Sequence, residues 1–314
     1  MIRSILVPLD GSPFGEYALP LAASIAREAP ARLQLVRVHR PLSAVAAEGI
    51  FLLDDLDQSL RVEEKLYLDR VARRLRNEAG VSATATLLDG DVAAALEERA
   101  TLSECDLVVL STHGRGALGR FWLGSVADEL IRRLPMPVLL VRPEEDPASS
   151  RNPPRFRRIL VPLDGTPLAE QIIEPALAVG APSEATFTLL RVVQPVPRYD
   201  YMPGGVTMEG VDALVVGQIL AHQKQLCDES RQYLEGVAAR LRSGGVAVET
   251  RVVVEDQPAV AILREALAGP SDLIALETHG RRGLSRLLMG SVADKVVRGG
   301  HLPVLLHRPA PGRP

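Results

Sequence analysis

The sequence has few cysteines, few aromatic residues and no excess of basic charge. Its two cysteines, Cys105 and Cys227, have neither a CxxC partner nor a histidine at metal-ligand spacing. This argues against a disulfide scaffold, a reactive thiol pair and a zinc site, and it suits a reducing compartment. The 36 Lys and Arg residues are matched by 39 Asp and Glu, and only 4% of residues are aromatic. The chain therefore lacks the basic patch and the stacking residues typical of nucleic-acid binders.

Long apolar runs are also lacking. No run approaches the roughly 20 residues that a membrane-spanning helix needs. The first apolar stretch is interrupted by Pro8 and Asp10, which argues against a signal peptide. These features predict a cytoplasmic protein with no membrane contact. At about 150 residues per domain, 314 residues predict two domains, and 46% hydrophobic residues suffice for two cores.

One sequence unit occurs twice. Segments 3–13, 106–115, 124–128 and 137–140 recur as 157–167, 272–281, 290–294 and 303–306. Repetition over this length indicates two copies of one fold. A stretch rich in proline and acidic residues separates them and predicts a first domain over 1–143, a linker over 144–155 and a second domain over 156–309.

The second copy carries an insertion. The offset between the copies grows from 154 to 166 residues, so about twelve extra residues lie within 194–222. Their glycine and proline content predicts a loop. Two roles stay open for it, a lid over the second site or a surface for another chain.

Each copy alternates short apolar runs with helical patterns. In the first copy, strands are predicted at 2–8, 32–39, 83–88, 107–110 and 138–141, and helices at 13–29, 57–79, 91–102 and 125–133. Apolar runs without polar alternation suit a parallel sheet that is covered on both faces. The pattern predicts a doubly wound α/β fold, in which ligands bind at the carboxyl ends of the strands. The loops after the first, second and fourth strands are therefore the candidate site.

Two of these loops carry recognisable chemistry. In Asp10-Gly11-Ser12-Pro13, Ser12 is the expected N-cap and Pro13 the first helical residue, which explains Asp10 less well. A carboxylate at this edge is placed to accept hydrogen bonds from a ribose or a base. After the fourth strand, Gly114 and Gly124-Ser125 frame nine residues and open a helix, with Ser125 as the expected cap. Helix amides and close backbone approach suit a phosphate.

Other motifs in these loops are weaker. Residues 114–119 match GxGxxG, but they follow the fourth strand, and the second copy loses the pattern; the P-loop lysine is also absent. His113 and His279 have no nucleophile arrangement around them, which favours a packing role over catalysis. Phosphate screening or simple solvation both suit Arg115, Arg120, Arg281, Arg282 and Arg286, and core packing is expected for Phe121 and Trp122.

Taken together, the Ile-Leu-Val-Pro-Leu-Asp-Gly start, the Thr-His-Gly segment, the Gly-x9-Gly-Ser spacing and the Pro-Val-Leu-Leu end resemble the universal stress protein family in both halves. The resemblance implies five parallel strands per half in the order 3-2-1-4-5, paired through the last strands as an intramolecular pseudo-dimer, with a homodimer as a further expectation. It also implies that ATP, with or without Mg²⁺, binds through a Gly-x2-Gly-x9-Gly-Ser/Thr motif. No catalytic residue is carried over. The implied binding positions are Asp10, Val38, Gly114, Gly124, Ser125 and Val126, and in the second copy Asp164, Val192, Gly280, Gly290, Ser291 and Val292.

Both copies depart from this motif at its first glycine, where Ser111 and Glu277 stand. Serine leaves room for a ligand, whereas a carboxylate about 4 Å from a phosphate would oppose binding by about 4 kcal/mol at an effective dielectric of 20. A bridging Mg²⁺ or a Glu277 side chain turned to solvent would cancel much of that. The sequence thus predicts a better first site. Two alternatives remain: an interaction protein of the same family that binds no nucleotide, and a slow ATPase, for which no water-activating base is evident.

Overall fold

The two halves of the chain share one continuous sheet. The computed structural model describes residues 1–42, 52–112, 123–142, 155–196, 213–278 and 289–308. Within these residues the strands are β1 (Ser4–Pro8), β2 (Arg32–His39), β3 (Ala83–Asp89), β4 (Leu107–Ser111), β5 (Val138–Val141), β6 (Arg158–Pro162), β7 (Thr186–Val193), β8 (Ala247–Val254), β9 (Leu273–Glu277) and β10 (Val304–His307). Their order is β3-β2-β1-β4-β5-β10-β9-β6-β7-β8. The predicted 3-2-1-4-5 order is confirmed in each half, and the two five-stranded sheets merge into one.

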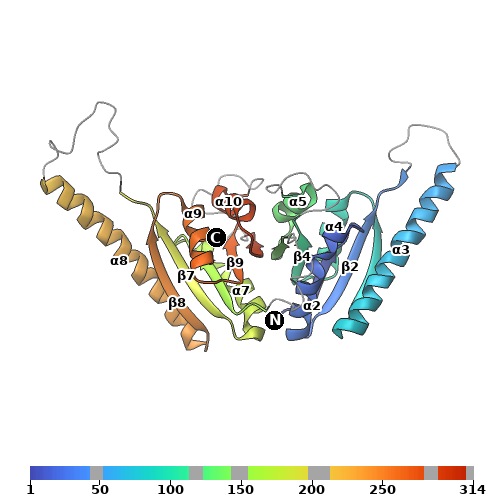
Figure 1. The fold of residues 1–314 in the computed structure, drawn as a ribbon, viewed down its shortest axis with the longest axis horizontal. Coiled ribbons are helices and arrows are strands. Elements are labelled where there is room, and N and C mark those ends of the chain that lie inside the picture. Colours follow the sequence, from blue (N-terminus) through green and yellow to red (C-terminus); the bar gives the residue numbers. More distant parts are fainter. Residues whose placement is uncertain (43–51, 113–122, 143–154, 197–212, 279–288, 309–314) are drawn as a thin grey trace, which may run out of the picture.

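Helices cover both faces of this sheet (Figure 1). They are α1 (Pro13–Glu16), α2 (Ala18–Glu28), α3 (Leu52–Ala79), α4 (Val92–Leu102) and α5 (Ser125–Arg133), then α6 (Pro167–Glu170), α7 (Ile173–Gly180), α8 (Ala213–Ser243), α9 (Pro258–Ala268) and α10 (Ser291–Gly299). One buried apolar cluster joins α2, α3, α7 and α8 to one face, and a second joins α4, α5, α9 and α10 to the other. Neighbouring strand residues such as Ile5 and Leu6 belong to different clusters, which is why the strands read as unbroken apolar runs.

The halves meet where β5 and β10 pair antiparallel (Figure 1). Leu139 lies opposite Leu305, and both side chains are fully buried. Arginines reinforce this seam reciprocally. The Arg142 guanidinium donates to the carbonyls of Arg298 and Gly300 at the end of α10, and Arg308 donates to the carbonyl of Arg132 at the end of α5. A cation at a helix C-terminus is electrostatically favourable. The expected intramolecular pairing through the last strands is therefore confirmed.

The first helix of each half is broken, which differs from the single helix predicted over 13–29. The break falls at Tyr17 in the first half, and α6 and α7 are separated in the same way in the second. Pro20 and Pro175 lie in the first turn of α2 and α7, where a missing N–H leaves no helical hydrogen bond unmade. Helix α3 also begins at Leu52, earlier than the predicted residue 57.

The domain boundaries stay a prediction. The expected linker over 144–155 falls almost wholly outside the described residues, as does most of the second-half insertion, over 197–212. Among the described helices, none combines the length and apolar character needed to cross a membrane.

Shortening a buried side chain where β5 pairs with β10 should lower the stability of the whole chain. Because Leu305 is fully buried between the halves, Leu305→Ala should lower the free energy of unfolding by about 2–5 kcal/mol, measured by urea denaturation of the full chain. Leu102→Ala is the control, since this leucine is 74% exposed; it should change stability by less than about 0.5 kcal/mol. Equal losses in the two variants would contradict a core position for the seam.

Candidate functional site

The turn after the first strand of each half is built by its aspartate. Asp10 Oδ1 accepts hydrogen bonds from the Ser12 amide (2.9 Å) and the Ser12 hydroxyl (2.7 Å). The Ser12 hydroxyl oxygen accepts from the Gly15 amide (3.2 Å) and so caps α1, as predicted. Gly11 has φ +82°, a left-handed conformation that favours glycine. Turn formation thus accounts for one oxygen of Asp10, which corrects the expectation that the strand-to-helix turn explains this residue less well than its neighbours.

The second half repeats this turn with threonine. Asp164 Oδ1 accepts from the Thr166 amide (2.9 Å) and hydroxyl (2.6 Å), and Thr166 caps α6. One difference concerns space. A Cβ on Gly15 would lie 2.6 Å from Asp10 Oδ1, whereas the second half carries Ala169 at this position. The two aspartates therefore do not occupy identical surroundings.

The end of β4 is tied directly to the start of α5. The Gly124 amide donates to the carbonyl of Thr112 (2.9 Å), whose own amide donates to Val141 on β5 (2.9 Å). Gly124 is the N-cap residue and no side chain caps this described helix; Ser125 is its first residue and is exposed. The prediction that Ser125 caps the helix is therefore wrong. At a helix N-terminus the first-turn amides point along the helix axis, where the dipole favours an anion.

The same arrangement recurs at α10. The Gly290 amide donates to the carbonyl of Thr278 (2.6 Å), Gly290 is the N-cap without a side-chain cap among the described residues, and Ser291 is exposed. Val126 and Val292, one residue further along each helix, are half-buried.

These residues gather at one edge of each half-sheet. Parallel strands β2, β1 and β4 are neighbours, so Val38, Asp10 and the Thr112–Gly124 junction follow or lie near their carboxyl ends. Val38 is half-buried opposite Leu88, and its counterpart Val192 lies opposite Val253. Outside the described residues lie Gly114, Gly280, His113, His279, Phe121, Trp122 and the arginines of both glycine-rich segments.

The Glu277 side chain is neither directed at the proposed phosphate position nor turned to solvent, the two orientations considered from the sequence. Its side chain is 2% exposed, and its Oε1 lies 2.7 Å from Nδ1 of His307, its neighbour in register on β10. The other oxygen, Oε2, is buried with no hydrogen-bond partner in the described structure. Burial raises the pKa of Glu277 to about 7, and His307 opposes that rise. The carboxylate is thus turned toward the neighbouring strand rather than extended into solvent.

His307 was not identified from the sequence, although a signal existed. At the offset of 166 residues, Ser111 and Val141 of the first half become Glu277 and His307 in the second. Both pairs lie in register, on β4 with β5 and on β9 with β10. The two halves therefore differ at both of these neighbouring positions, which hold Ser111 and Val141 in the first half and an ionisable pair in the second.

Comparison with known proteins decides the family. The sequence model described as "Universal stress protein family" matches residues 1–142 and again 155–308. The chain belongs to the universal stress protein family. Its two matched regions make it a tandem member, as the sequence motifs implied.

Individual relatives support this assignment. One Mycobacterium tuberculosis universal stress protein is 27% identical over 97% of this chain and 94% of its own length. Another from that organism is 30% identical over 66% of this chain, and that match spans 63% of the relative. A crystal structure of an Archaeoglobus fulgidus universal stress protein shares the fold, with a TM-score of 0.66 and 18% identity over 98% of this chain and 97% of that one.

The described part of this universal stress protein contains no group of three or more His, Cys, Asp or Glu side chains placed to hold a metal ion. Cys105 and Cys227 are both buried and unpaired, and burial raises the pKa of the Cys105 thiol to about 11.

Glu277 should make the stability of this universal stress protein pH-dependent. The folded chain holds the Glu277 proton up to about pH 7, against an ordinary pKa of 4.5, so stability is lost as pH rises through this interval. Glu277→Gln should remove up to about 3 kcal/mol of that loss, because the amide carries no charge to desolvate. Unfolding free energies at about pH 5 and about pH 8 measure it.

The matched control is Glu249→Gln on β8, where the glutamate is exposed. It should keep the wild-type slope. If the unfolding free energy of Glu277→Gln changed with pH as much as that of wild type, burial of this carboxylate would not destabilise its ionised form.

Proposed function

We propose that this tandem universal stress protein binds ATP or a related adenine nucleotide at the carboxyl edge of each half. Family membership supports a role in stress response. The observation that carries the proposal is the start of α5, where Gly124 and an exposed Ser125 open a helix without a side-chain cap in the described chain, and its repetition at α10. Amides at a helix N-terminus are suited to phosphate oxygens.

The residues present fit an adenine nucleotide. The adenosine would lie between the Asp10 turn and Val38, and the phosphates over Gly114, Gly124, Ser125 and Val126, with Mg²⁺ able to accompany them. In the second half, Asp164, Val192, Gly280, Gly290, Ser291 and Val292 are the corresponding positions. When bound, the nucleotide would supply negative charge to the helix N-terminus; the protein's own part is to orient amides and exclude water.

The first half is proposed as the better site. Glu277 keeps a carboxylate at the end of β9, beside the Thr278–Gly290 junction, whereas the first half has Ser111. The contact with His307 reduces the repulsion expected from the sequence. We therefore expect a smaller gap between the sites than the two to three decades of affinity that an unpaired charge would give.

Nucleotide binding would act on the pairing of the halves or on contacts with a partner. Support comes from α5 and α10, each of which begins at a proposed phosphate position and ends at an arginine of the other half. A ligand shifts such an equilibrium when it prefers one arrangement. We also propose that the protein is cytoplasmic and has no enzymatic role. The two cysteines that form no disulfide favour the cytoplasmic location.

A second candidate is an interaction protein of this family that binds no nucleotide. The replacement of the first motif glycine by Ser111 and Glu277, the latter already paired within the protein, favours it.

A negative charge introduced at the first residue of α5 or α10 should weaken nucleotide binding to one half only, so that the two sites can be measured separately. Ser125→Glu adds a carboxylate that suits the helix dipole but repels phosphate, so it should preserve stability and weaken Mg-ATP binding to the first half at least tenfold. Ser291→Glu should do the same in the second half alone. Isothermal titration calorimetry on nucleotide-stripped protein gives the affinity and number of sites.

Ser125→Ala is the control and should bind nearly as wild type, because the backbone amides remain. Absence of heat in wild type at high ligand concentration, with no rise in melting temperature, would favour the interaction protein. Phosphate release that exceeds a buffer blank would instead favour the slow ATPase.

A further inference from the structure

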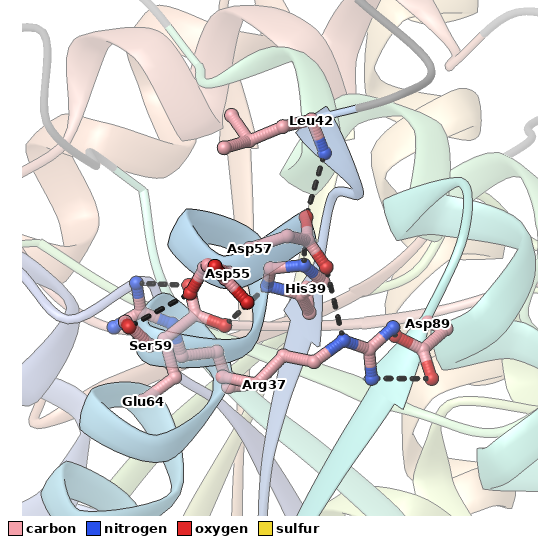
Figure 2. A network of polar contacts seen from close by, with 9 residues as sticks. Arg37, His39, Leu42, Asp55, Asp57, Ser59, Glu64 and Asp89 are labelled. Atoms are coloured by element: carbon pink, nitrogen blue, oxygen red, sulfur yellow. Dashed lines mark hydrogen bonds and ion pairs between the residues drawn. The ribbon is translucent and has the colours of Figure 1, made fainter. Parts of the chain in front are cut away.

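A buried histidine lies between two carboxylates at the carboxyl end of β2 (Figure 2). The His39 side chain is 2% exposed. Its Nε2 lies 3.0 Å from Asp57 Oδ1 and its Nδ1 lies 2.8 Å from Glu64 Oε2, and both acidic residues come from α3. The ring therefore joins β2 to two successive turns of that helix.

Toward two ionised carboxylates, only a ring protonated on both nitrogens can donate both hydrogen bonds. A neutral imidazole donates from one nitrogen and presents a lone pair from the other, here toward a carboxylate oxygen. Asp57 is held in its ionised form. Its pKa lies below the ordinary value, chiefly because the Leu42 amide donates to it (2.7 Å), with His39 and Arg61 adding to the effect against some desolvation. The geometry thus calls for a charged His39.

The neighbouring charges give the same result. Arg37 on β2 pairs with Glu64 (2.8 Å) and lies over the Tyr67 ring (5.7 Å). Arg61 on α3 pairs with Asp57 (3.2 Å) and with Asp89 at the end of β3 (2.6 Å). These arginines and carboxylates together leave one negative charge, which a protonated His39 balances. Loss of that proton leaves the charge uncompensated next to a buried ring.

The second half makes the same connection without a titratable ring. The Val196 amide donates to Gln223 Oε1 (2.6 Å), as the Leu42 amide donates to Asp57 in the first half. The positions of His39, Asp57, Arg61, Glu64 and Asp89 are taken by Val193, Gln223, Cys227, Ser230 and Glu255. A neutral amide holds this exit from β7, so it does not depend on a histidine proton.

We propose that His39, when protonated, is a positioning residue that holds the carboxyl end of β2 against α3, and that it makes this strand–helix contact sensitive to pH in the first half but not at its counterpart in the second half. Acid conditions strengthen the contact until the carboxylates themselves become protonated; alkaline conditions release it. Val38 directly precedes His39, so the adenosine side of the first site would be affected, whereas the corresponding side of the second site, at Val192, would not. This consequence rests on the proposed nucleotide binding, whereas the contact itself does not.

Hydrogen exchange of the full, nucleotide-free chain tests the contact. After correction for intrinsic exchange, amides of α3 around Asp57 and Glu64 should open about tenfold more often at about pH 8.5 than at about pH 5.5, the size expected for one charge-assisted hydrogen bond. The corresponding part of α8 should change little. NMR of ¹⁵N-labelled histidine should show His39 losing its proton with the same midpoint as the opening of α3.

The matched variant exchanges the cluster for its second-half counterpart. His39→Val/Asp57→Gln/Glu64→Ser should fold, because the second half already uses these residues, and it should abolish the pH dependence of α3 exchange. Equal pH dependence in the variant and wild type, or proton loss from His39 without any opening of α3, would overturn the proposal.

The nucleotide consequence is measured separately. In a Ser291→Glu background, Mg-ATP affinity of the first half should fall as pH rises through the same midpoint. In Ser125→Glu/Glu277→Gln, where the carboxyl beside the second site can no longer ionise, affinity of the second half should stay level. If neither variant binds nucleotide at any pH, the proposed function fails while the exchange experiment still decides the role of His39. Binding in both backgrounds with identical pH profiles would overturn the link between His39 and the site.

Discussion

The antiparallel pairing of β5 with β10 is the interaction on which the arrangement of this molecule depends. It converts two sheets, each with an exposed edge at its last strand, into one sheet whose central strands are covered on both faces. The pairing also brings the last helix of each half within reach of an arginine from the other. At this seam the buried Leu139 and Leu305 lie opposite each other, and α5 and α10 each end at an arginine of the other half.

Much of the fold could be predicted because the sequence repeats itself. Apolar runs without alternation gave all the strands of the first half to within two residues at each end, and the capping role of Ser12 followed from one turn. Two predictions of helix boundaries failed because a neighbouring residue determined the local backbone. The apolar pattern predicted one helix over 13–29, but Pro20 cannot donate the hydrogen bond that a continuous helix would need, and the helix is divided before it. Serine is a common N-cap residue, which favoured Ser125, but Gly124 is the N-cap of α5.

The candidate site was less predictable than the fold, because its details depend on contacts between residues that are distant in the sequence. Such contacts cannot be inferred from each residue taken alone. Glu277 could be judged from the sequence only as a charge near a ligand; its contact with His307 depends on the register of two strands. His39 lies at the end of an apolar strand, and its partners are 18 and 25 residues away on a helix. Tertiary contact, not spacing, sets the chemistry of both histidines.

Fusion of the halves in one chain changes how their pairing responds to concentration. Two separate subunits come apart on dilution, but halves joined covalently face each other at an effective concentration set by the connecting segment. The pairing of β5 with β10 therefore does not depend on the cellular abundance of the protein. A ligand that acts on this pairing does so within one chain, by changing its geometry or by opening it, because the halves stay covalently joined.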